Sequence, residues 1–167
     1  MITMRWMRFV AFFLIMISCK GYAQNIFRKE ILLNEGWISI SDEKNIHAYD
    51  GFEKQNFNKK GWINVNIPHN WDQYEGYQRK LHGNKHGYAW YKRTFKINSA
   101  KQGKQFFLYF EGVGSYATIW LNGTKVGYHA GGRTTFSLNV THAIKLNNQD
   151  NVLAVRADHP ANIQDLP

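Results

Sequence analysis

Alternation of apolar and polar side chains is the main pattern along this chain from residue 90 onward. Residues 90–97 alternate large apolar with charged side chains, which is the period of a strand with one buried face. Similar runs predict strands at 105–110, 116–121, 125–129, 134–140 and 151–157, the last one less regular than the others. Shorter strands are expected at 31–33, 37–40 and 62–67. No window keeps the helical period of 3.6 residues, so the pattern predicts an all-β fold.

Turn signals separate the predicted strands. Asn122 and Gly123 both tolerate positive φ angles and stand between two of the runs, so they predict a two-residue hairpin turn. Residues 130–132 are expected to interrupt the pairing, and Thr141 is expected to cap a short helical turn that runs through Ile144. Many short strands joined by turns are typical of a β-sandwich, and we expect the jelly-roll form of it.

The first 23 residues read as an export signal. Arg5 and Arg8 supply positive charge, residues 9–17 are apolar without interruption, and Ala23 is a small residue suited to cleavage. An apolar run of this length is too short to span a bilayer, so no transmembrane segment is expected. The predicted boundaries are 1–23 for a signal peptide and 24–167 for one domain, exported to the periplasm or the cell exterior. The alternative is a buried N-terminal helix.

Cys19 is the only cysteine in the chain. Cleavage after Ala23 would leave a mature chain without disulfide or thiol chemistry. Residues 16–18 also suit a lipoprotein signal, in which case the protein would be lipid-anchored through Cys19.

The formal net charge of +9 raises the question of an acidic partner. The lysines and arginines are scattered singly or in pairs, such as Lys59-Lys60 and Arg79-Lys80, and no nucleic-acid motif accompanies them. We therefore favour a solvated basic surface and expect no nucleic-acid partner.

Histidines and glycines give no metal or cofactor site. His82 and His86 have the spacing of a helical zinc pair, but Gly83 and Gly87 argue against a helix, and no cysteine or nearby acid completes the set. Residues 112–114 lack the third glycine of a dinucleotide-binding loop and precede a strand. The sequence predicts neither a metal nor a cofactor.

The polar stretch between Asn70 and Gly87 is predicted to be a long surface loop. Aromatic residues lie within it and beside it, namely Trp71, Tyr74, Tyr77 and Tyr88. Aromatic rings with a few polar groups suit a glycan site, and they equally suit anchoring of the loop to the sandwich.

Motifs along most of residues 33–158 resemble one known family, the family 2 glycoside hydrolases of the β-galactosidase and β-glucuronidase group. They are Pro68-His69-Asn70-Trp71, Gly87 to Arg93, Phe107 to Val113, Ala117 to Gly123, Val126 to Gly132 and Asn151 to Asp158. The chain departs from the family pattern at Asn70 in place of an acid, Arg133 in place of an aromatic and Thr135 in place of proline.

The resemblance implies the N-terminal sugar-binding jelly roll of such an enzyme, followed in family members by an immunoglobulin-like domain and a (β/α)₈ barrel. The catalytic glutamates belong to that barrel, on which this domain would pack, and neither has a counterpart here. Family members also add a further strand, so we expect an exposed strand edge, marginal stability and a tendency to associate.

No catalytic residue is predicted in this chain. Retaining glycoside hydrolysis needs two carboxyl groups about 5–5.5 Å apart. Asp42-Glu43 and Asp72/Glu75 lie in polar loop segments, and Glu111 ends a strand. The resemblance points to Asp158 and His159 as sugar-binding residues, with a strand-end cap as the alternative for Asp158, and Trp71 joins them as an aromatic contact.

Three functions remain open from the sequence. The chain is a non-catalytic part of a β-galactosidase-like hydrolase acting on O-glycosyl bonds, a free-standing exported carbohydrate-binding module, or a non-catalytic subunit that docks on a separate catalytic chain. A β-galactoside-like glycan is the expected ligand.

Overall fold

The structure is a computed structural model that describes residues 28–42, 50–54, 60–71, 86–100 and 103–161. Residues 28–32 belong to a first unit that ends at Leu32; they form neither helix nor strand, and Arg28 and Glu30 make an exposed ion pair of 2.9 Å. Every described strand lies in the second unit, which begins at Leu33. The predicted signal peptide and Cys19 lie outside the described residues, as does most of the predicted loop between Asn70 and Gly87.

The described residues form eight strands and no helix. The strands are β1 (Trp37–Asp42), β2 (Ile63–Val65), β3 (Gly87–Lys96), β4 (Phe107–Phe110), β5 (Tyr116–Leu121), β6 (Thr124–Ala130), β7 (Phe136–Asn139) and β8 (Asp150–His159). Each lies where the alternating pattern predicts one. The expected strand at 31–33 is wrong, because these residues have no strand partner. Within the described ranges, no helix is long and apolar enough to cross a membrane.

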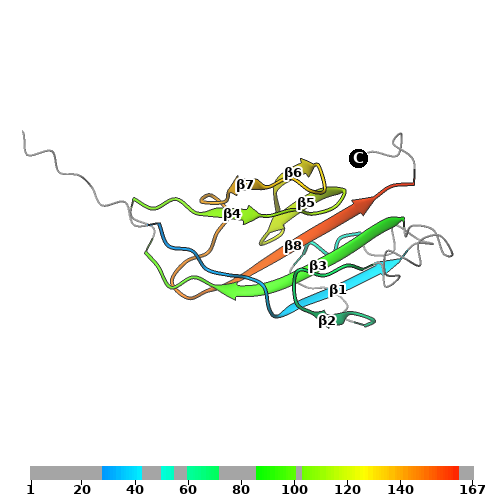
Figure 1. Cartoon of the computed structure of the whole chain (residues 1–167). Helices are drawn as coiled ribbons and strands as arrows, with labels where there is room; N and C mark the ends of the chain where they lie inside the picture. Colours follow the sequence, from blue (N-terminus) through cyan, green and yellow to red (C-terminus); the bar gives the residue numbers. More distant parts are fainter. Residues whose placement is uncertain (1–27, 43–49, 55–59, 72–85, 101–102, 162–167) are drawn as a thin grey trace, which may run out of the picture. The chain divides into compact units, whose positions relative to one another are not determined.

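Two antiparallel sheets make up the described part of this unit. Six strands pair in the order β2-β1-β3-β8-β5-β6, and β4 pairs with β7 in a smaller sheet. Figure 1 shows β4 and β7 as a separate layer beside the larger sheet. The all-β sandwich prediction is confirmed.

The core lies between the two layers. The larger sheet contributes alternate side chains from each central strand, and the smaller sheet faces them with Leu108 and with the partly buried Phe136 and Leu138. The buried side chains on the core face of the central strands are Ala89, Tyr91 and Phe95 of β3, Ala117, Ile119 and Leu121 of β5, and Leu153, Val155 and Ala157 of β8. Alternation in these strands therefore has the cause that the pattern suggests, one face turned toward a second layer.

β8 is buried on both of its faces, which explains its irregular pattern. Val152 and Ala154 point away from the core and are 7% and 0% exposed. A central strand covered on both sides loses the polar side chains that alternation requires. β8 pairs with β3 on one side and with β5 on the other, so it has no free edge along the residues that both neighbours share.

The predicted hairpin is confirmed in its turn and refined in its pairing. Leu121 pairs with Thr124, so Asn122 (φ 55°) and Gly123 (φ 83°) form the two-residue turn with both φ angles positive. The register shifts between Ile119 and Trp120, which introduces a bulge that the sequence did not reveal.

Thr141 has a different role from the predicted helix cap. The carbonyl of Val140 accepts the turn's hydrogen bonds, from the amides of Ala143 and Ile144 at 2.9 and 3.0 Å. The hydroxyl oxygen of Thr141 instead accepts a hydrogen bond from the amide of Phe106 at 2.9 Å. Thr141 therefore joins the segment after β7 to the start of β4, and the helical-turn prediction is wrong in its capping residue.

Two asparagines tie the hairpin to the start of β8. Asn122 donates from its side chain to the carbonyl of Ala143 at 2.8 Å and to the side-chain oxygen of Asn151 at 2.9 Å. Asn151 is 0% exposed; it accepts from the amide of Lys145 and donates to its carbonyl, both at 2.7 Å. This amide pair satisfies main-chain groups of Ala143 and Lys145, and so ties the hairpin turn and the start of β8 to the segment between β7 and β8.

Replacing Asn151 by Leu is expected to lower the free energy of unfolding by about 2–4 kcal/mol, because the buried amide and carbonyl of Lys145 lose their partner. Urea unfolding measures the change. Ser137→Ala, on the exposed face of β7, serves as the control and should change stability by less than about 0.5 kcal/mol. A loss below about 1 kcal/mol in Asn151→Leu would contradict the proposed role of the pair.

Candidate functional site

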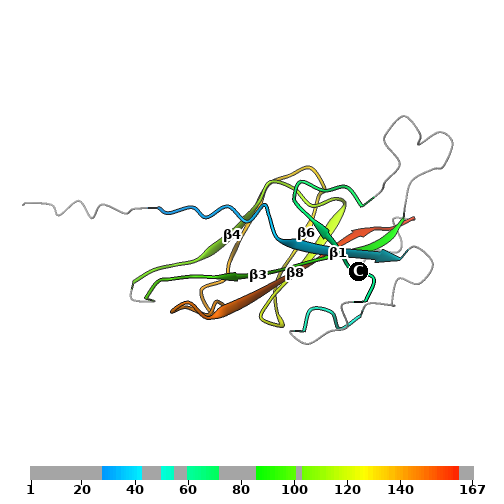
Figure 2. The same ribbon diagram turned by 90° about the horizontal axis from the view of Figure 1, so that it is seen from below.

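The ends of three strands of the larger sheet come together. His159, at the end of β8, pairs with Gly87 at the start of β3, and Asp42, at the end of β1, pairs with Tyr88. Figure 2 shows these ends on one side of the sheet. Two of the three predicted sugar-binding residues, Asp158 and His159, lie here.

Asp158 and His159 nevertheless point to opposite faces. Ala157 belongs to the core face, and successive side chains along a strand alternate, so Asp158 points away from the core and His159 toward it. The sequence grouped these two neighbours, but the strand separates their side chains.

Asp158 is held in a buried ion pair. Its side chain is 1% exposed, and Arg156 donates to its two oxygens from Nε at 2.8 Å and from a terminal nitrogen at 3.1 Å. Burial raises the pKa of the Asp158 carboxyl, while the hydrogen bond and charge of Arg156 and the charge of Lys125 act in the opposite direction. The carboxylate is thus engaged inside the protein, and its predicted contact with sugar stays a prediction.

Aromatic rings surround the Arg156 guanidinium. Its central carbon lies 4.4 Å from the ring centroid of Tyr88, 5.8 Å from that of Trp90 and 5.9 Å from that of Trp120. Rings at these distances stabilise a cation that burial would otherwise penalise. The bidentate pair and the rings fix Arg156 in one position.

His159 lies among polar groups at the strand ends. Its ring centroid is 4.9 Å from that of His86, and its Nδ1 is 3.4 Å from the hydroxyl oxygen of Ser115. The side chain is half-buried. Imidazole and hydroxyl groups that reach solvent in this way can exchange hydrogen bonds with a polar ligand.

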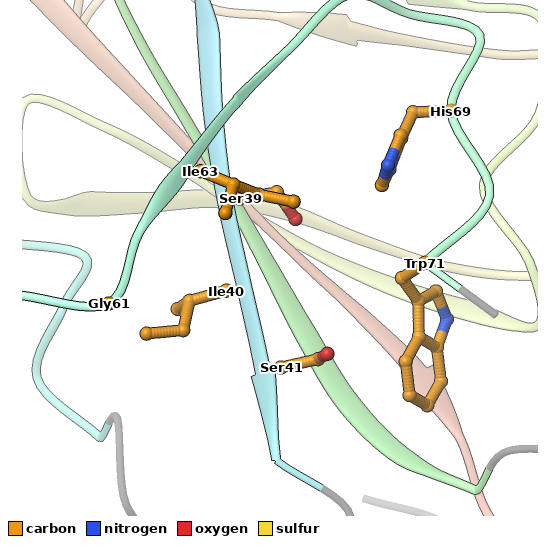
Figure 3. A pocket seen from close by; sticks show the side chains of 7 residues that line it. All are labelled: Ser39, Ile40, Ser41, Gly61, Ile63, His69 and Trp71. Carbon is orange, nitrogen blue, oxygen red and sulfur yellow. The ribbon is translucent and has the colours of Figure 1, made fainter. Parts of the chain in front are cut away.

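Trp71 lines a depression at the edge of β1. The depression has a volume of about 180 Å³, and Figure 3 shows its walls. The lining residues are Ser39, Ile40, Ser41, Gly61, Ile63, His69 and Trp71. This volume is comparable with that of an engineered cavity of about 150 Å³ that takes up one benzene molecule.

A hydrogen bond fixes the polar wall of this depression. His69 Nδ1 lies 3.0 Å from the hydroxyl of Tyr91, whose ring packs edge-on against the imidazole. Burial raises the pKa of Tyr91 to about 12, although a hydrogen bond with Ser39 lowers it, and burial lowers the pKa of His69. At neutral pH a neutral imidazole therefore lines the site, and the neutral phenol of Tyr91 holds it from the core.

The chemistry available is recognition by stacking and hydrogen bonding. Trp71 offers a flat ring, and Ser41 and His69 offer donors and acceptors, whereas Ser39 is 3% exposed and bonds to Tyr91. No group of three or more His, Cys, Asp or Glu residues that could hold a metal occurs among the residues that the structure describes.

Sequence reasoning found Trp71 but not the partners that give it a site. His69 stands in the same four-residue motif, so its position was within reach. Tyr91 and Ser39 carry no such signal, because they belong to strands whose alternation reads simply as core. Trp71 also packs against the core cluster on the face opposite Asp158, so the structure does not gather the predicted residues on one face.

An antiparallel β-sandwich with an aromatic ring and neutral polar groups at its edge defines a class of domain suited to binding small polar ligands. Residues 19–164 match the family described as glycosyl hydrolases family 2, sugar binding domain. The chain belongs to this family, as the motifs indicated.

Individual relatives agree with this assignment. A β-galactosidase of Thermoanaerobacter pseudethanolicus is 40% identical over 70 residues, which cover 42% of this chain and 9% of that protein. Among solved structures, a glycosyl hydrolase family 2 member from Bacteroides cellulosilyticus is 28% identical with a TM-score of 0.61. The match covers 74% of this chain and 17% of that protein. Bacteroides uniformis β-glucuronidase is 27% identical with a TM-score of 0.63, and the match covers 82% of this chain and 15% of that protein. This chain thus spans less than a fifth of the length of each protein.

Replacing Arg156 by Met is expected to cost about 3–5 kcal/mol of stability near pH 7, because Asp158 would stay buried without its cation. Where a carboxyl has a higher pKa in the folded than in the unfolded chain, the protein loses stability as the pH rises from the unfolded-state pKa to the folded-state pKa. The deficit should therefore shrink as the pH falls toward about 4. Unfolding measured at both pH values, with Arg156→Met/Asp158→Leu as the matched variant, tests this. Equal losses at both values would contradict it.

Proposed function

We propose that this chain is the non-catalytic, carbohydrate-binding domain of a glycoside hydrolase that acts on β-galactosides or β-glucuronides. The observation that carries the proposal is the Trp71 depression in a chain of the family 2 sugar-binding type. The two activities are those in the names of the matched relatives. In the proposed protein the sandwich is a jelly roll that packs on a catalytic barrel.

The binding site in this proposal has two parts. A pyranose ring lies with its C–H face on the Trp71 indole, and the hydroxyl of Ser41 and the His69 imidazole bond to its hydroxyls. His159, beside His86 and Ser115, contacts a neighbouring part of the glycan. A direct contact of Asp158 would require Arg156 to release it.

Two acids of the described residues are engaged in ion pairs, which supports a non-catalytic role for them. Asp158 is paired with Arg156 at 2.8 Å, and Asp150 lies 3.6 Å from Lys96. A general acid and a nucleophile must instead face each other across the substrate. Turnover in the proposed protein is therefore assigned to residues of the catalytic barrel and not to this domain.

The purified chain should bind methyl β-galactoside or methyl β-glucuronide. It should hydrolyse neither nitrophenyl β-galactoside nor nitrophenyl β-glucuronide. Trp71→Ala should weaken binding by about tenfold, because a stacked ring contributes on the order of 1 kcal/mol beyond its buried area. Trp71→Phe keeps a ring and should retain part of the affinity. Calorimetry measures binding, and release of nitrophenol measures turnover.

Measurable turnover by the chain alone would overturn the non-catalytic assignment. Equal affinity in the parent chain and in Trp71→Ala would overturn the assignment of the depression, whatever the outcome for turnover.

Export is part of the proposal. Arg5 and Arg8 followed by the apolar residues 9–17 support cleavage after Ala23 and a periplasmic or extracellular location. Mass spectrometry of the protein from a bacterial host should give a mature chain that begins at Gln24. A chain that begins at a lipid-modified Cys19 would instead support the lipid-anchored alternative, and an uncleaved cytoplasmic chain would contradict export.

A further inference from the structure

The face of the larger sheet that points away from the core is covered unevenly. Over β1 and β3 it is closed, with Trp90 1% and Lys92 2% exposed and the Lys92 ammonium donating to the carbonyl of Lys54. Over β5 and β6 (Figure 1) the same face carries aromatic rings that reach solvent. Tyr128 is 40% exposed, and Tyr116 and Trp120 are half-buried.

Strand register places these three rings together. Ala117, Ile119 and Leu121 face the core, so Tyr116 and Trp120 point the other way. Tyr128 pairs with Thr118, which puts it on the same face and diagonal to Tyr116. We name Tyr116, Trp120 and Tyr128 the aromatic platform.

The rings of the platform are held in a defined orientation. Tyr116 and Tyr128 are nearly parallel, with an interplanar angle of 7° and centroids 6.4 Å apart. Trp120 packs against the buried Trp90 with centroids 5.3 Å apart, and the Arg156 guanidinium lies 5.9 Å from its centroid. Because a rigid sheet and buried neighbours position them, the rings lose little freedom when a ligand stacks on them.

The charge beside the platform is positive. The Lys125 ammonium lies 6.0 Å from the Tyr128 centroid, and Lys125 is exposed. Asp158, the acid on this face next to Tyr116 in register, is 0% exposed and paired with Arg156. An approaching ligand therefore meets aromatic rings and an ammonium group.

We infer that the aromatic platform and Lys125 form a second carbohydrate site, which takes a glycan chain bearing carboxylate groups. Sugar rings present flat C–H faces that stack on aromatic planes, and a uronate carboxylate at the rim pairs with Lys125. A protein partner is the less suitable occupant, because lysine is depleted in protein–protein interfaces, whereas here the exposed Lys125 lies beside the rings.

This site is separate from the Trp71 depression. Trp71 packs on the core side of the sheet, and the platform lies on the opposite side. The inference about the platform therefore does not depend on sugar binding in the depression. A ligand of several sugar units could bind at one of the two sites and leave the other empty.

The test is calorimetric titration of the purified chain with a glucuronate-containing tetrasaccharide and with its carboxyl-reduced, neutral counterpart. Tyr128→Ala should weaken binding of the acidic ligand by about 3- to 10-fold, while Tyr128→Phe keeps the ring and most of the affinity. Lys125→Gln should weaken binding of the acidic ligand and leave binding of the neutral ligand unchanged. Added salt should reduce the difference between the two ligands.

Tyr109→Ala is the matched control, because Tyr109 is also an exposed ring, 59% exposed, on β4 of the other sheet. It should leave binding unchanged, and unchanged thermal unfolding shows that each variant is folded.

Absence of binding, an effect of Tyr109→Ala equal to that of Tyr128→Ala, or full affinity in Tyr128→Ala would overturn the inference. If Trp71→Ala alone removes tetrasaccharide binding, the depression is the site and the platform is not. If the tetrasaccharide still binds to Trp71→Ala and depends on Tyr128, the platform stands even where the depression fails.

Discussion

Pairing between β3 and β8 is the constraint on which the rest of the described structure depends. Ten consecutive residue pairs join them, from Gly87 with His159 to Lys96 with Asp150. β1 adds to one side of this pair and β5 to the other, so the register of the larger sheet follows from it. A slip of one residue would exchange the two faces and turn Ala157 and Val155 out of the core.

That register also decides which side chains can act together. It sends Asp158 and Arg156 to one face, beside Tyr88 and Trp90, and leaves His159 on the other. An ion pair inside a cage of rings is a costly way to cover a sheet face, since apolar side chains would cover it without desolvating charge. The ion pair does hold each surrounding ring in one position. A sugar stacks best on rings that are fixed in this way.

Much of the fold could be predicted from the sequence, because the signals were local. Alternation located the strands, and Asn122-Gly123 located the hairpin turn. The family motifs are confirmed by the match over residues 19–164. Thr141 was misjudged because a hydroxyl can accept from any nearby amide, and the amide of Phe106 is distant in sequence. β8 looked irregular because burial on both faces removes the pattern.

The candidate site was less accessible to sequence reasoning. Trp71 stood out as an aromatic residue in a motif, but its partner His69 bonds to Tyr91, which reads as a core residue. Asp158 stood out at a strand end, yet its engagement depends on Arg156, two residues away on the same face. Such contacts follow from register, which a single sequence does not specify.

The most direct measurement is amide chemical-shift mapping of the isotope-labelled chain during titration with methyl β-glucuronide. A carbohydrate-binding sandwich with its site at the edge of β1 predicts shifts at Ser39, Ser41, His69 and Trp71, with the centre of the β3–β8 pairing unchanged. Saturating ligand with no shift at these residues, or shifts spread through the core strands, would contradict it.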